Sequence, residues 1–84
     1  MKLTPARRKV LARANEGELI VSQPRGNHLP YEPAYWSAGR ETVDGRVLHA
    51  LVDAGYLDTQ RDGVVGAART HEITFAGRQA LSSQ

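Results

Sequence analysis

The chain has 84 residues, a formal net charge of +2, 40% hydrophobic and 24% charged residues, and no cysteine. This length suits one domain spanning residues 1–84, and the composition is that of a globular protein rather than a disordered one. Disulfides and cysteine-ligated zinc are excluded. Because the sequence shows neither a secretion signal nor an apolar run near the ~18 residues of a membrane span, we expect a cytoplasmic protein.

The first predicted element is a helix over residues 5–14. Thr4 is a favoured N-cap, and Pro5 suits the first helical position, where its missing N–H costs nothing. Positive charge gathers in this part of the chain, because residues 1–13 contain no acid and five basic residues, namely Lys2, Arg7, Arg8, Lys9 and Arg13. Such a cluster is typical of a solvated helix face as well as of a phosphate-binding one.

A short strand is predicted next, at residues 18–22, after residues 15–17 have ended the helix. Its branched apolar composition favours an extended conformation. The proline, glycine and asparagine within residues 23–27 favour a turn that closes the strand.

Two prolines restrict the segment that follows. Pro30 and Pro33 limit any helix in residues 29–40 to a short one that starts near Pro33 and ends at Gly39. The segment holds three of the five aromatic residues of the chain, Tyr31, Tyr35 and Trp36. Large aromatic side chains dominate burial in small domains, so one interpretation is that they cover the core. The other interpretation is an exposed patch that docks or stacks on a partner.

The most regular element is an amphipathic helix over residues 42–54. Thr42 is its predicted N-cap, with Asp44 in the first turn, where the helix dipole favours a carboxylate. Apolar residues recur with a helical period on one face, at Val43, Val47, Leu48, Leu51 and Val52. The opposite face is free to contact a partner and carries Gly45, Arg46, His49 and Asp53. Gly55 is the expected left-handed C-cap.

Two strands and a last helix complete the predicted fold. Strands at residues 56–60 and 69–73 are expected to form an antiparallel pair. The residues between them, 61–68, make too long a connection for a tight turn and are interpreted as a flexible wing. Thr74 then caps a final helix that runs through Leu81.

Three local phrases resemble the winged helix-turn-helix superfamily. LTPARRKVL at residues 3–11 is similar to the opening helix of that group, and LVDAGYL at residues 51–57 to the end of a recognition helix that runs into the wing. ITFAGRQAL at residues 73–81 is similar to the phrase that follows the wing in MarR-type proteins. The chain most resembles small single-domain winged-helix proteins of actinobacteria and their phages. The resemblance implies an α+β fold of three to four helices with a small antiparallel sheet and a β-hairpin wing. Residues 29–40 depart from the usual second helix.

The resemblance also implies a DNA-binding transcriptional regulator whose partner is double-stranded DNA. In DNA-binding members of the superfamily, the longer helix enters the major groove and the wing contacts the neighbouring backbone or minor groove. Transferred to this chain, the recognition helix spans about residues 42–54 and the wing about residues 56–73. The implied DNA contacts are Arg40, Thr42, Gly45, Arg46 and His49 at the helix, with Arg61 and Arg69 beside the wing.

Further phosphate contacts are implied for Arg7, Arg8 and Arg13 if the first helix faces the DNA backbone. MarR-type regulators pair through long terminal helices, and the flanking segments here are short. We therefore expect a monomer or a weak homodimer.

A second hypothesis is a winged-helix module for protein interaction, such as a small phage factor that acts on a host protein. The acidic residues near the recognition helix weigh against DNA binding, because residues 40–58 carry two arginines against four acids. Two apolar features favour the protein-interaction hypothesis. Its candidate partner surface consists of the aromatic residues Tyr35 and Trp36 and of the apolar wing residues Val64 and Val65.

An enzyme is the weakest interpretation of the sequence. His28, His49 and His71 are isolated, with no His-x-x-x-His pair for a metal, and no serine lies in a nucleophile-elbow context. Gly63 and Gly66 have the spacing of a KH-domain clamp but lie between two predicted strands, so they are interpreted as turn glycines. We therefore predict no catalytic activity, no cofactor and no metal.

Overall fold

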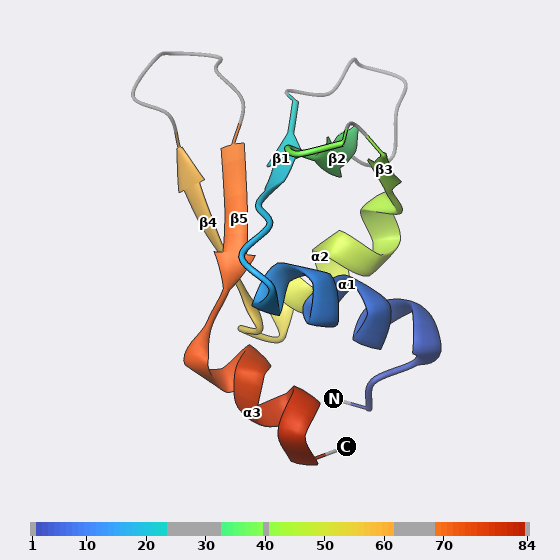
Figure 1. The fold of residues 1–84 in the computed structure, drawn as a ribbon, viewed down its shortest axis with the longest axis vertical. Coiled ribbons are helices and arrows are strands. Elements are labelled where there is room, and N and C mark those ends of the chain that lie inside the picture. Colours follow the sequence, from blue (N-terminus) through green and yellow to red (C-terminus); the bar gives the residue numbers. More distant parts are fainter. Residues whose placement is uncertain (1, 24–32, 40, 62–68, 84) are drawn as a thin grey trace.

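Figure 1 shows the computed structural model of the chain, in which the described residues are 2–23, 33–39, 41–61 and 69–83. These described residues form three helices and five strands in a mixed α+β arrangement. In chain order they are α1 (Pro5–Asn15), β1 (Ile20–Ser22), β2 (Ala34–Trp36), β3 (Thr42–Val43), α2 (Gly45–Asp53), β4 (Leu57–Arg61), β5 (Arg69–Ile73) and α3 (Phe75–Ser83).

The first helix forms where the sequence predicts it. Thr4 has an extended backbone, and its Oγ1 accepts a hydrogen bond from the Arg7 N–H over 3.3 Å. Pro5 occupies the first helical turn. The helix ends at Asn15, and Gly17 follows with a φ of +99°, a left-handed conformation that glycine adopts without strain.

The helix predicted between Pro33 and Gly39 is wrong, because residues 34–36 form strand β2. Burial alternates along this strand, with Ala34 and Trp36 buried and Tyr35 half-buried, which is the period of two that a strand requires. The described residues therefore contain three helices, where three to four were expected.

The start of the main helix also differs from the prediction. Thr42 is not its N-cap but belongs to β3, where it pairs with Tyr35. Asp44 is the N-cap instead, and its Oδ1 accepts a hydrogen bond from the Arg46 N–H over 2.9 Å. Aspartate and threonine are both favoured caps, so pairing of Thr42 with the sheet decides between them. The helix is consequently α2, Gly45–Asp53, rather than residues 42–54.

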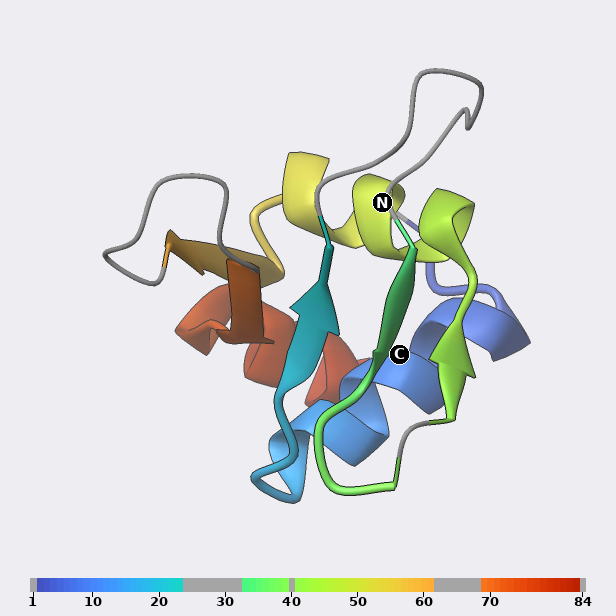
Figure 2. The same ribbon diagram turned by 90° about the horizontal axis from the view of Figure 1, so that it is seen from above.

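All neighbouring strands pair antiparallel, in the order β3-β2-β1-β5-β4. β1 is central, since Ile20 pairs with Trp36 of β2 on one side and with His71 of β5 on the other. Figure 2 shows β1, β2 and β3 passing in front of α1, so this helix covers one face of this part of the sheet. No described helix lies across the opposite face.

The hydrophobic core lies between the sheet and the helices. Leu11 of α1, Ile20 of β1 and Leu51 of α2 are its most deeply buried large side chains. The predicted inner face of α2 is confirmed, because Leu48 and Leu51 are buried and Val47 and Val52 pack against the core. In the described part of the chain, no helix has the length and apolar content to cross a membrane.

The last helix docks against the turn that follows α2. The Thr74 hydroxyl donates to the Gly55 carbonyl over 2.7 Å and accepts from the Gly77 N–H over 3.1 Å, so it caps α3 and also ties it to this turn. α3 extends to Ser83, two residues beyond the predicted end.

The turn itself supplies a first test. Gly55 has a φ of +80°, and a Cβ built there meets no atom within 4 Å. We therefore expect Gly55→Ala to lower the free energy of unfolding by about 1–2 kcal/mol through backbone strain alone. Gly55→Asn should restore part of that loss, because asparagine tolerates the left-handed conformation. Denaturant unfolding of the two variants measures the difference, and equal losses would contradict a backbone cause.

Candidate nucleic-acid interface

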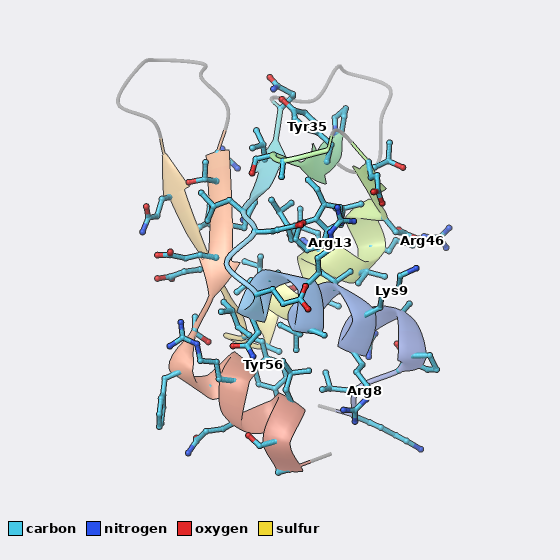
Figure 3. All side chains as sticks on the ribbon, viewed as in Figure 1. Arg8, Lys9, Arg13, Tyr35, Arg46 and Tyr56 are labelled. Atoms are coloured by element: carbon cyan, nitrogen blue, oxygen red, sulfur yellow. The ribbon has the colours of Figure 1, made fainter. Side chains whose placement is uncertain are left out.

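The exposed face of α2 carries the residues that the helical period places there. Arg46, His49 and Asp53 are exposed, and Gly45 is half-buried at the start of the helix. In Figure 3 the Arg46 side chain projects away from the molecule. His49 Nε2 lies 3.1 Å from Asp53 Oδ2, so these two side chains contact each other one helical turn apart. Arg46 is therefore the cation that the first turn of α2 offers to a partner.

The two arginines beside the predicted wing lie opposite each other. Arg61 is the last residue of β4, Arg69 is the first residue of β5, and the register pairs them directly. From the sequence alone, Arg61 and Arg69 were expected only to flank the wing, and their direct pairing was not predicted. The register therefore brings two arginine positions together at this end of the ladder.

Two other candidate DNA contacts are placed differently. Thr42 is exposed but lies in β3 opposite Tyr35, so it is not part of the α2 face. Arg40, Val64 and Val65 lie outside the described residues.

The aromatic residues of β2 do not form an exposed patch. Trp36 is 4% exposed and belongs to the core, so its assignment to a partner surface is wrong and the core interpretation is confirmed for it. Tyr35 is half-buried, and its hydroxyl accepts a hydrogen bond from Gln23 Nε2 over 2.8 Å. Figure 3 places Tyr35 above the strands and Arg13 below them, on the helical side.

Arg13 is held in a cluster that the sequence did not predict. Its guanidinium carbon lies 4.6 Å from the centroid of the Trp36 ring. Its Nε pairs with the Glu18 carboxylate. Its Nη1 and Nη2 donate to the two carboxylate oxygens of Glu41 over 2.8 and 3.4 Å. We call these four residues, Arg13, Glu18, Trp36 and Glu41, the Arg13 cluster. Two carboxylates already bind Arg13, which makes the implied phosphate contact of this residue less favourable.

The cluster has a defined electrostatic consequence. The hydrogen bonds and charge of Arg13, assisted by the charge of Lys9, hold the pKa of the Glu41 carboxyl below its usual value. Stability from this pair is therefore present above the usual pKa range of glutamate and is lost as the pH falls through the lowered pKa. No spacing rule could have found the pair, because Arg13 and Glu41 are 28 residues apart.

A second unpredicted group lies in the centre of the sheet. His71 Nε2 is 2.9 Å from Ser22 Oγ, and His71 Nδ1 is 3.1 Å from Thr59 Oγ1, which links β1, β5 and β4. A serine beside a histidine is the arrangement of a nucleophile and its base. Ser22, however, is only 2% exposed, so a substrate has no access to its hydroxyl. The group therefore stabilises the sheet.

Among the described residues, no group of histidine, aspartate and glutamate side chains is arranged to hold a metal ion. Comparison of the chain with protein-family models, with curated proteins and with solved structures found no match.

Proposed function

We propose that the chain is a non-enzymatic DNA-binding protein of the winged-helix type, acting in the cytoplasm as a transcriptional regulator. In this proposal α2 enters the major groove and the β4–β5 pair is the wing. The observation that carries the proposal is the register that sets Arg61 opposite Arg69. In this proposal the two arginines contact the same stretch of the DNA backbone.

The order of the elements supports the same assignment. α2 leads through the turn at Gly55 into β4, and β5 returns to pair with β1. A bound helix reads bases with its amino-terminal residues, and Arg46 is exposed in the first turn of α2. The chain differs from the usual winged helix in the segment before α2. The described residues there form strands β2 and β3 rather than a helix.

The proposal predicts two kinds of arginine variant. Arg46→Ala should remove about 1–3 kcal/mol of discrimination between a selected DNA site and random DNA, because arginine contacts guanine through two hydrogen bonds. Arg61→Ala and Arg69→Ala should weaken binding to both DNAs and lower the salt slope of the affinity by about one each. Fluorescence anisotropy with duplexes of ~20 base pairs, about two helical turns, measures both quantities.

Arg78→Ala is the matched control, because Arg78 is an exposed arginine on α3. It should leave the discrimination and the salt slope unchanged. If Arg46, Arg61 and Arg69 can each be replaced without effect, α2 and the wing do not contact DNA.

A protein-interaction module is the second candidate function. Trp36 is buried and does not offer a surface to a protein partner. Phe75 at the start of α3, by contrast, is 72% exposed. An aromatic side chain at this exposure is a suitable anchor for a protein partner. Absence of DNA binding even at low salt would favour this function over DNA binding, since phosphate contacts are strongest there.

A further inference from the structure

We infer that Arg13 is a positioning residue for the DNA-contacting surface, acting through Glu41 on the first turn of α2. The inference rests on the proposed role of α2 in DNA binding. It assigns to Arg13 a part in recognition that requires no contact with DNA.

Arg13 is held by three neighbouring side chains. Its guanidinium lies against the Trp36 ring and binds Glu18 and Glu41, and its side chain is 24% exposed. An isolated surface ion pair contributes little, but two-pronged arginine contacts that form part of a network hold their geometry better. Trp36 and Glu18 fix the guanidinium, and Glu41 is the partner that it holds.

Glu41 is attached in turn to β2 and to the start of β3. Its carbonyl accepts the Trp36 N–H over 2.7 Å, and it precedes the two-residue strand β3 directly. Asp44 follows β3 and caps α2 through the Arg46 N–H. A strand of two residues is a short attachment, and the contact of Glu41 with Arg13 adds a second attachment of this connection, to α1. Movement of Glu41 would therefore shift Asp44 and Arg46 together.

A positioning role and a direct phosphate contact predict changes of opposite sign in DNA affinity when the charge of Glu41 is removed. Removing an acidic charge near a DNA-binding surface ordinarily strengthens DNA binding. In our inference Glu41→Gln weakens binding instead, by about threefold or more, because the Arg13 contact is lost. Arg13→Met keeps an unbranched aliphatic stem but loses the guanidinium that lies over Trp36 and binds the two carboxylates. It should weaken binding similarly while leaving the salt slope unchanged. If Arg13 contacts a phosphate, Arg13→Met lowers that slope by about 0.9.

The experiment combines these affinities with amide hydrogen exchange of the free full-length protein. The Trp36 N–H reports on Glu41, and the Leu48 N–H, which donates to the Asp44 carbonyl over 3.0 Å, reports on the cap of α2. Both should exchange at least about fivefold faster in Arg13→Met and Glu41→Gln. The Tyr56 N–H, which donates to the Leu51 carbonyl over 2.9 Å, should not change and corrects for any loss of global stability. Arg78→Met is the matched variant and should leave all three amides unchanged.

The outcomes distinguish the inference from the proposed function. Either of two results overturns the positioning role. The first is unchanged exchange at the Trp36 and Leu48 amides. The second is a lower salt slope in Arg13→Met together with tighter DNA binding by Glu41→Gln. If the unmodified protein binds no DNA, the proposed function fails. Faster exchange would then still establish that Arg13 positions α2, and unchanged exchange would remove that role as well.

Discussion

We expect Gly77→Ala to lower the free energy of unfolding by about 3 kcal/mol, although alanine is the better helix former by about 1 kcal/mol. Gly77 is buried in α3, and a Cβ built on it lies 2.5 Å from the Tyr56 carbonyl oxygen and 2.8 Å from Ile73 Cγ1. The Tyr56 carbonyl also accepts the Thr74 N–H over 3.0 Å, so it cannot move aside without breaking the attachment of α3. α3 should therefore separate from the turn after α2.

The neighbouring position provides the control for Gly77. Ala76 is exposed on the same helix, and Ala76→Gly should cost only about 1 kcal/mol through helix propensity. Denaturant unfolding at constant pH measures both variants. A stabilised or unchanged Gly77→Ala protein would contradict the close packing of α3 against the Tyr56 backbone.

The second large effect is expected at His71. His71→Leu should lower the free energy of unfolding by about 2–4 kcal/mol, because it leaves the buried Ser22 hydroxyl without the ring nitrogen that lies 2.9 Å away. Thr59 is exposed, so its hydroxyl can turn to water and contributes less to the loss. Thermal and denaturant unfolding followed by circular dichroism measure the change.

A double-mutant cycle tests whether Ser22 and His71 act as a pair. Ser22→Ala alone removes the hydroxyl that lies 2.9 Å from the buried His71 Nε2, whereas Ser22→Ala combined with His71→Leu removes both polar groups. The double variant should therefore lose less than the sum of the two single variants. Gln60→Ala, which removes the exposed 3.0 Å bond to Glu72 on the same strands, should change stability by no more than about 0.5 kcal/mol. Strict additivity would show that Ser22 and His71 do not depend on each other.

Local chemistry was sufficient to predict much of the fold. Neighbouring residues decide the conformation at the ends of helices, and the predicted roles there are confirmed. They are those of Thr4 and Pro5 at the start of α1, Gly55 after α2, and Thr74 before α3. The apolar period of α2 correctly predicted which residues are buried and which, like Arg46, are exposed. Such features depend on contacts within about one helical turn.

The errors lie where distant partners decide the structure. Thr42 would cap a helix in isolation, but pairing with Tyr35 draws it into β3 and transfers the cap to Asp44. Residues 34–36 form a strand because β1 pairs with them and Trp36 fills the core, neither of which is encoded in the local pattern around Pro33. The same limit applies to the candidate site. The spacing of Arg61 and Arg69 indicated their places beside the wing but not their register. Two of the partners of Arg13, Trp36 and Glu41, are distant from it in sequence.

The central place of β1 affects how the protein can fold during synthesis. One neighbour, β2, follows after a short stretch of chain, but Ser22 and its partner His71 are 49 residues apart. At about 5–20 residues per second, the ribosome releases β5 several seconds after β1. During that interval the β5 side of β1 has exposed, unpaired backbone groups that a chaperone or another nascent chain can bind. Cooperative folding of the whole sheet should therefore occur only after β5 has emerged.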